Sequence, residues 1–311
     1  MDLEKEFGFT KETVKMKPDY EGEVIITIFK RNASSGSKKA LLYLHGFNDY
    51  FFQTHLADKI NEAGFNFYAL ELRKYGRSIL PHQSPNFFKN HNEYFEDIDK
   101  AVEIVKERDG NKMLVLMGHS TGGLLFSLYA HHKNDKNIID ALVLNSPFFE
   151  FNEPGILLKS FVPLMTSIGK RFPYLPSPKG LDKGYGYSLH KKYHGEWDYD
   201  LKLKPIEGFK IYAGWIGGIH TAQKELQKGL DIKCPVLVMV SGKSVKPGNY
   251  RPEMQSADSV LNVKHIKKYA KGLGEKTDIL EFDGGLHDLV LSKKEVREKV
   301  LNKMASFISS L

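Results

Sequence analysis

Short runs of hydrophobic residues alternate along this chain with segments whose apolar positions are three or four residues apart. A run of this length suits a buried strand, whereas the spacing in between suits the apolar face of a helix. The alternation predicts the α/β class, a mostly parallel central sheet flanked by helices. The runs are 40–44, 65–72, 113–117, 141–145, 235–240 and 278–282.

Further segments refine this prediction. Residues 23–29 alternate between apolar and polar side chains, which indicates an early antiparallel strand. The helical spacing of 54–63 ends at Gly64, a residue that favours a helix C-cap. The remaining expected helices are 92–107, about 260–271 and 292–309.

The pattern is interrupted between residues 148 and 227. This segment is rich in Pro, Gly, Tyr and Trp, and no buried strand stands out in it. It is too long for a simple loop, so we expect a cap inserted between two strands of the sheet. The chain then forms one domain, with the core in 1–147 and 228–311 and the cap, or lid, in 148–227.

The strongest chemical signal is Gly118-His119-Ser120-Thr121-Gly122, directly after the apolar run 113–117. A strand, Gly-x-Ser-x-Gly and a following helix form a nucleophile elbow, a turn that holds the serine side chain clear of the backbone. Glycines flank the serine because neighbouring strands leave no room for a Cβ atom. The alternative is an ordinary strand-to-helix turn. The surrounding sequence favours Ser120 as the nucleophile of an acyl transfer.

A serine nucleophile needs a general base, and the base needs an acid to orient it, in the chain order Ser, Asp or Glu, His. His287 follows paired glycines at the end of the last strand, where the base belongs. Candidates for the acid are Asp258 and Glu253. Asp258 is favoured because a residue just before the helix at 260–271 would face the same edge of the sheet as His287. A helix N-cap is the alternative role for Asp258. Asp283 is a weaker candidate.

An oxyanion hole requires two backbone N–H groups. We expect one from Thr121, the residue after the nucleophile. We expect the other from Phe47, because Gly46 lets the loop after the run 40–44 approach closely. The neighbouring His45 and His119 are interpreted as structural rather than catalytic residues.

These motifs resemble the α/β hydrolases of the serine aminopeptidase-like branch, which includes monoacylglycerol lipases and lysophospholipases. The resemblance implies an α/β-hydrolase fold with Ser120 as nucleophile, Asp258 as acid and His287 as base. The stretch 45–50 departs from the glycine- and glutamate-containing loop of typical monoacylglycerol lipases, and is closer to a bacterial subgroup of hydrolases and lysophospholipases. The similarity extends over nearly the whole chain and rests on 45–47, 72–78, 118–123, 258–261 and 284–288.

The cap is expected to select the acyl group. Phe161 and Met165 lie in an apolar stretch with helical spacing, and both tryptophans of the chain, Trp197 and Trp215, fall within the cap. Tryptophan suits a pocket with an apolar body and a wet rim, so we assign these four side chains to substrate binding. Packing of the apolar helix on the core is the alternative interpretation.

Composition and charge limit the partners. A formal net charge of +7 comes from lysines that are scattered beside acids, and the sequence has no nucleic-acid motif. We expect no nucleic-acid partner and at most peripheral contact with an anionic membrane. The longest apolar stretch, 156–168, is too short to span a bilayer, and the first residues lack a signal-peptide pattern. The single cysteine, Cys234, allows no intrachain disulfide. A cytoplasmic protein is expected, with its oligomeric state open.

The sequence thus predicts a serine carboxylester hydrolase that forms an acyl-enzyme and acts on monoacyl lipids or related medium-chain esters. This reaction requires no metal or cofactor. An aminopeptidase is the main alternative, because Glu196 and Asp198 offer acidic groups for a free amino terminus. Acyltransferases and C–C bond hydrolases share the same triad, and a non-catalytic binding protein on this fold is a further interpretation.

Overall fold

The computed structural model describes residues 2–34, 36–133, 138–153 and 155–311. Within these residues, eight strands form one sheet: β1 (Thr10–Asp19), β2 (Gly22–Arg31), β3 (Lys39–Leu44), β4 (Asn66–Glu71), β5 (Met113–His119), β6 (Ala141–Asn145), β7 (Val236–Ser241) and β8 (Thr277–Phe282). Their spatial order is β1-β2-β4-β3-β5-β6-β7-β8. The pairs β1–β2 and β2–β4 are antiparallel, and every pair from β4 to β8 is parallel.

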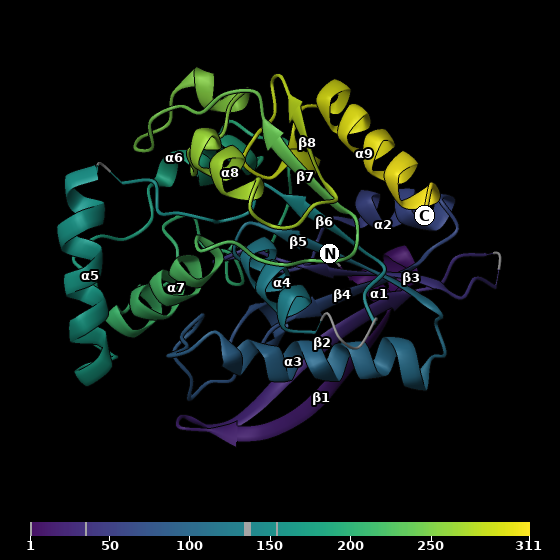
Figure 1. The fold of residues 1–311 in the computed structure, drawn as a ribbon, viewed down its shortest axis with the longest axis horizontal. Helices are drawn as coiled ribbons and strands as arrows, with labels where there is room; N and C mark the ends of the chain where they lie inside the picture. The colour runs from purple at the N-terminus through teal and green to yellow at the C-terminus, as the bar shows by residue number, and fades with distance from the viewer. Residues whose placement is uncertain (1, 35, 134–137, 154) are drawn as a thin grey trace.

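Helices cover both faces of this sheet (Figure 1). One layer contains α2 (Thr54–Glu62) and α9 (Lys294–Ser309), and the other contains α3 (Asn92–Glu103), α4 (Thr121–His132) and α8 (Val263–Ala270). Successive strand side chains point to opposite faces, so Leu41 packs in the cluster with α2 and α9, and Leu42 in the cluster with α3, α4 and α8. The predicted α/β fold is confirmed. Shorter helical segments are α1 (Leu3–Phe7), η1 (Gly76–Ser78), η4 (Pro252–Gln255) and η5 (Leu289–Leu291).

Two elements differ from the sequence prediction. The edge strand β1 was not predicted, because its side chains are exposed or half-buried along its whole length. A strand without a buried face shows no apolar run. The predicted helix at 92–107 changes character near its end, where α3 passes into a π-helical turn, η2 (Ile104–Arg108).

The segment between β6 and β7 contains α5 (Gly155–Arg171), α6 (Lys183–Leu189) and α7 (Ala213–Leu226). In the described residues it adds no strand to the sheet, and β6 and β7 pair directly. Helices α5 and α7 pack on each other at one side of the molecule (Figure 1), and α7 also contacts α4. This is the arrangement expected of an inserted cap, although the division at residues 148 and 227 stays a prediction.

The segment 72–78 after β4, one of the resembling motifs, is fixed by buried ion pairs. Arg73 binds Asp97 at 2.7 Å, and both side chains are almost fully buried. Lys74 binds Asp19 at 2.7 Å, although Asp19 ends β1 at the far edge of the sheet. Breaking such a pair leaves an uncompensated buried charge, so these contacts hold the segment after β4 against α3 and the end of β1.

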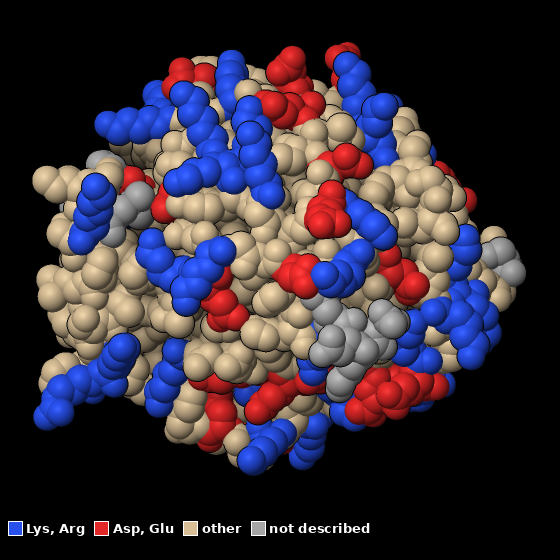
Figure 2. Space-filling model, viewed as in Figure 1, with Lys and Arg blue, Asp and Glu red and all other residues tan. Residues whose placement is uncertain are grey.

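Charged side chains of both signs are mixed on the face drawn in Figure 2, where Lys and Arg are interspersed with Asp and Glu. On this face, the distribution agrees with a solvated basic surface rather than a single basic groove. None of the helices in the described ranges has the length and apolar character needed to cross a membrane.

Candidate active site

Ser120 stands in a strained turn between β5 and α4. Its backbone has φ +51° and ψ −114°, a conformation that residues with a side chain rarely adopt. A Cβ atom on Gly118 would lie 2.5 Å from the carbonyl oxygen of Gly122, and one on Gly122 would lie 2.6 Å from the carbonyl oxygen of His45. Neither position tolerates a side chain, and the turn has the geometry of a nucleophile elbow.

Ser120, His287 and Asp258 form one hydrogen-bonded chain. His287 Nε2 lies 3.1 Å from Ser120 Oγ, and His287 Nδ1 lies 3.0 Å from Asp258 Oδ2. The second carboxylate oxygen, Oδ1, accepts hydrogen bonds from the backbone N–H groups of Val260 and Leu261, both at 2.8 Å. A carboxylate at Nδ1 favours the imidazole tautomer that carries its proton there, so Nε2 is free to accept the serine proton.

Asp258 reaches this place although it lies far along the chain from the end of β7. Its N–H donates to the carbonyl of Lys243 at 3.0 Å, and the N–H of Val245 donates to the carbonyl of Asp258 at 2.9 Å. The intervening residues form an excursion that contains η4 and returns to the end of the sheet. The carboxylate is therefore directly beyond β7 in space, where an acid of this fold belongs.

The other candidates for the acid lie at the surface, and Asp258 does not have the alternative role of a helix N-cap. Glu253 is exposed and forms an ion pair with Arg251 at 2.9 Å. Asp283 is also exposed. The N-cap of α8 is Asn262, whose side chain accepts from the N–H of Lys264, so Asp258 does not cap this helix.

The two proposed oxyanion donors lie on either side of Ser120. Thr121 is the first residue of α4, and an N–H at this position has no acceptor in the preceding turn of the helix. A Cβ atom on Gly46 would lie 3.1 Å from Ser120 Cβ, so the loop that carries Phe47 runs against the nucleophile. This close approach is the condition for two N–H groups to share one oxyanion.

The histidines beside these donors have structural contacts. His45 Nδ1 lies 2.8 Å from the carbonyl of Gly46, and His45 Nε2 accepts from the N–H of Leu72 at 3.2 Å. This pattern requires a neutral ring, and burial lowers the pKa of His45 to about 4. His119 Nδ1 lies 3.2 Å from the carbonyl of Asn145, and burial lowers the pKa of His119 as well.

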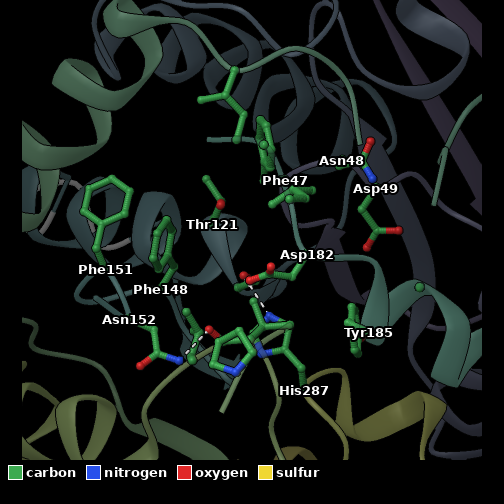
Figure 3. A pocket seen from close by; sticks show the side chains of 18 of the residues that line it. Phe47, Asn48, Asp49, Thr121, Phe148, Phe151, Asn152, Asp182, Tyr185 and His287 are labelled. Carbon is green, nitrogen blue, oxygen red and sulfur yellow. Dashed lines mark hydrogen bonds between the residues drawn. The ribbon is translucent and has the colours of Figure 1, made fainter. Parts of the chain in front are cut away.

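Ser120 and His287 line a cavity of about 230 Å³ beneath the cap. Figure 3 shows the rings of Phe148 and Phe151 on one side of His287, and Asp49 and Tyr185 on the other. The wall thus mixes aromatic and polar groups: Asn152 lies on the side of the two phenylalanine rings, and the aromatic residues Phe47 and Tyr185 lie on the side of Asp49. Other apolar residues of the wall are Phe47, Phe161, Val162, Trp215 and Ile216, and other polar ones are Asn48, Asn152, Glu153, Asp182 and Lys204.

Comparison with known proteins identifies the family and the fold. Residues 35–293 match the family model Hydrolase_4, which is described as Serine aminopeptidase, S33. The chain belongs to this family. The resemblance expected from the motifs is therefore confirmed, and the chain is an α/β hydrolase. None of the curated proteins matches it.

Solved structures share the fold over nearly their full length. A soluble variant of the monoglyceride lipase of Saccharomyces cerevisiae, in complex with a substrate analogue, is 18% identical with a TM-score of 0.71, covering 95% of this chain and 94% of its own. The monoacylglycerol lipase of Paleococcus ferrophilus is 19% identical with a TM-score of 0.65, covering 97% and 99%. A carboxyl esterase of Bacillus coagulans is 14% identical with a TM-score of 0.65, covering 97% and 98%. Identities this low establish the common fold.

The four predicted substrate-binding residues of this hydrolase divide into two groups. Trp215 and Phe161 line the cavity. Trp197 does not: its indole N–H donates to the carbonyl of Leu291 at 2.7 Å, and its ring stacks on His55 at 4.7 Å, against the α2–α9 layer. Met165 is also outside the wall, and it is buried in the hydrophobic cluster that includes α7. Apolar spacing alone does not distinguish the cavity wall from the packing face of a cap helix.

A buried polar cluster that the sequence did not predict lies in this hydrolase and is formed by Asp49, His119, Asp288 and Lys204. One ligand-type atom from each of Asp49, His119 and Asp288 lies within 4.8 Å of the others, as in a cation site. The Lys204 ammonium lies 2.5 Å from Asp49 Oδ1 and supplies positive charge there. Burial acts to raise the pKa of Asp288, but His119, Lys204 and a hydrogen bond from Asn145 hold it below its usual value.

The cap also contacts the proposed base of this hydrolase. The ring of Tyr185, in α6, lies 5.5 Å from the ring of His287 in an edge-on arrangement. Its hydroxyl accepts a hydrogen bond from the N–H of Asp288 at 3.1 Å. No sequence signal distinguishes Tyr185 or Lys204, because the chain contains 15 tyrosines and many lysines.

Proposed function

We propose that this hydrolase is a serine carboxylester hydrolase. The observation that carries the proposal is the hydrogen-bonded chain of Ser120, His287 and Asp258, of which Ser120 and His287 line a cavity with several aromatic side chains in its wall. A serine hydroxyl is weakly nucleophilic at neutral pH, and a hydrogen-bonded imidazole overcomes this by accepting its proton. All three side chains are buried, so water competes little for these hydrogen bonds.

The first half-reaction forms an acyl-enzyme. Ser120 Oγ attacks the ester carbonyl carbon while His287 Nε2 accepts the hydroxyl proton, and Asp258 stabilises the resulting imidazolium. The carbonyl oxygen becomes an oxyanion, which accepts hydrogen bonds from the N–H groups of Phe47 and Thr121. The intermediate collapses with cleavage of the carbon–oxygen bond, and His287 donates its proton to the departing alcohol.

The second half-reaction releases the acid. Water attacks the acyl carbonyl while His287 accepts one of its protons, and the same N–H groups hold the second oxyanion. Collapse returns the proton from His287 to Ser120 Oγ. The cycle closes with no metal or cofactor taking part.

Monoacyl lipids and related medium-chain esters are the proposed substrate class. The acyl chain lies against the aromatic wall residues Phe148, Phe151 and Trp215, and the alcohol lies toward Asn48 and Asp49.

The two acids first considered for a free amino terminus do not support a peptidase. Glu196 forms an ion pair with Arg297 and Asp198 forms one with Lys191, and neither acid lines the cavity. Of the acids that do line it, Glu153 forms an ion pair with Lys179 and Asp49 forms one with Lys204, so Asp182 is the group that would have to bind an amino terminus.

Hydrolysis of p-nitrophenyl esters from acetate to laurate tests the proposal. Ser120→Ala should reduce turnover by about 10⁴-fold or more, because the nucleophile is lost. Ser127→Ala is the matched control, since this serine lies in α4, directly after the turn that carries Ser120, and its hydroxyl donates to the carbonyl of Gly123. Amino-acid p-nitroanilides, tested in parallel, give the amide comparison.

The outcomes separate the candidate functions. Ester turnover that is lost in Ser120→Ala and kept in Ser127→Ala supports the proposal, and the best chain length measures the acyl pocket. Faster cleavage of the anilides than of the esters would favour a peptidase. No turnover, together with no fluorophosphonate labelling of Ser120 in folded protein, would leave a binding role.

A further inference from the structure

The loop that carries Phe47 is held by the cap along most of its length. The contacting residues of the loop are 47, 48, 49, 50 and 52, and their partners all fall between 199 and 215. Two contacts join rings: Phe47 lies 4.2 Å from Trp215, and Phe52 lies 5.2 Å from Tyr199. Three are hydrogen bonds: Asn48 Nδ2 donates to the carbonyl of Pro205 at 2.9 Å, the N–H of Phe209 donates to Asn48 Oδ1 at 3.2 Å, and the N–H of Asp200 donates to the Tyr50 hydroxyl at 2.7 Å. The last is an ion pair, with Lys204 Nζ 2.5 Å from Asp49 Oδ1.

One of these contacts, between Lys204 and Asp49, is a buried ion pair. The side chains of Lys204 and Asp49 are 9% and 2% exposed. The ammonium also lies over the rings of Phe52 and Tyr199, at 5.5 and 5.6 Å from their centres. Asp49 Oδ2 is buried and accepts no hydrogen bond within the described residues. Loss of the lysine would therefore leave a buried carboxylate without its cation, a strongly unfavourable state.

The Lys204–Asp49 pair lies next to the proposed oxyanion donor, Phe47. Asp49 lies two residues after Phe47, and the residue between them, Asn48, has φ +51°, a conformation that depends on surrounding contacts. The loop approaches the nucleophile so closely that a Cβ atom on Gly46 would lie 3.1 Å from Ser120 Cβ. A small displacement of the loop would move the Phe47 N–H out of reach of an oxyanion.

We infer that Lys204 is a positioning residue, through which the cap holds Asp49 and thereby the oxyanion loop against Ser120. Lys204 also neutralises a carboxylate that would otherwise oppose negative charge forming on the substrate oxygen. The inference rests on the proposed function, because it assigns Phe47 to the oxyanion hole. It makes the cap a part of the catalytic geometry as well as the cover of the cavity.

A charge-removal series tests this inference. The variants are Lys204→Met and the double variant Asp49→Asn/Lys204→Met, with Glu196→Gln as a control that breaks the cap–core ion pair with Arg297. The substrate is p-nitrophenyl butyrate. The second probe is a trifluoromethyl ketone with the same acyl chain, whose serine adduct places an oxyanion in the hole.

Lys204→Met should lower kcat by about 10- to 100-fold with KM changed by less than about threefold. This loss in kcat is no larger than the loss caused by removing one hydrogen-bond donor from an oxyanion hole. The inhibition constant of the ketone should rise in parallel with the loss in kcat. The double variant should recover kcat to within about fivefold of wild type, because residue 49 no longer carries a charge and Asp288 keeps its hydrogen bond from Asn145. Glu196→Gln should match wild type in both measurements.

Several results would overturn the inference. One is a Lys204→Met variant with a lower melting temperature but wild-type kcat and ketone affinity, which would make the pair merely structural. Another is a double variant as slow as Lys204→Met, since the loss would then not arise from Asp49. If Lys204→Met does not fold, Lys204→Gln takes its place with the same expected pattern. Absence of ester turnover in wild type would instead contradict the proposed function itself.

Discussion

The backbone N–H of Asp258 donates a 3.0 Å hydrogen bond to the carbonyl of Lys243, at the end of β7. This bond brings the carboxylate into reach of His287 Nδ1, at 3.0 Å. A hydrogen-bonded acid at this nitrogen fixes the tautomer of the base and stabilises its protonated form.

Asp258→Asn should therefore lower kcat by about 10³- to 10⁴-fold with little change in KM, since an amide cannot stabilise the imidazolium. Steady-state kinetics on p-nitrophenyl butyrate gives both constants. Glu253→Gln serves as the control and should retain wild-type kcat, because Glu253 pairs with Arg251 at the surface. A large loss in Glu253→Gln with normal turnover in Asp258→Asn would reverse the assignment.

The two tryptophans of the cap should respond differently to the same change. Trp215→Leu enlarges the cavity and should shift the preferred p-nitrophenyl ester toward longer acyl chains. Trp197→Leu should leave the chain-length profile unchanged. It should lower the free energy of unfolding by about 2 kcal/mol, because packing and the hydrogen bond to Leu291 are lost from a half-buried ring. A shifted chain-length profile in Trp197→Leu would place that residue in the substrate site after all.

His45 should make the fold sensitive to acid. Burial lowers its pKa from 6.5 to about 4 in the folded protein, so between these values the unfolded chain binds a proton that the folded chain does not. This contribution to stability is complete above pH 6.5 and is lost as the pH falls toward 4, by up to about 3 kcal/mol. Urea unfolding across this range measures it.

His45→Asn should flatten this dependence, although the variant will be less stable than wild type at neutral pH because the Leu72 N–H loses its acceptor. His82→Asn, at an exposed histidine, is the control and should behave as wild type. A slope unchanged by His45→Asn would assign the acid sensitivity to other groups.

The outer side of α5 should promote contact with lipid surfaces. Ile156, Leu164 and Phe172, on α5 and directly after it, are 78%, 57% and 59% exposed. Lys170 and Arg171 are exposed beside them, and the molecular edge over α5 is largely uncharged in Figure 2. Exposed apolar residues next to basic ones favour an anionic interface.

The double variant Leu164→Glu/Phe172→Glu should lower turnover of a monoacyl substrate in anionic vesicles by about tenfold, with turnover of a dissolved short-chain ester unchanged. Tyr193→Glu, at an exposed aromatic residue after α6, is the matched control. Equal losses on vesicles and on the dissolved ester would mean that the substitutions damage the cavity rather than an interfacial contact.

Much of the core was predictable because each buried strand leaves a local pattern. The apolar runs at 40–44 and 113–117 match β3 and β5, and the motif around Ser120 follows from the crowding of Gly118 and Gly122. The edge strand β1 left no such pattern, because neither of its faces is buried. Local patterns thus identify elements that bury a face, and they miss an edge strand such as β1, whose Val14 and Met16 are only partly buried against the core.

The contacts of the candidate site were less predictable because they join distant parts of the chain. The choice of Asp258 over Glu253 depends on how the loop after β7 folds back to Lys243, which spacing does not reveal. The pairing of Lys204 with Asp49 is a contact of the same kind. Trp197 and Trp215 have the same chemistry and both fall in the cap, so only the path of the backbone separates them.

The contacts between residues 199–215 and the loop at 47–52 limit how the cap of such an enzyme can be replaced. Because β6 and β7 pair without help from the intervening segment, a replacement cap could be spliced between them without disturbing the sheet. A donor cap that lacks the counterpart of Lys204 would nevertheless bury Asp49 without its counter-ion. Cap and loop therefore have to be exchanged as a unit, and a chimera built from the cap alone should require a compensating change at Asp49 before it regains turnover.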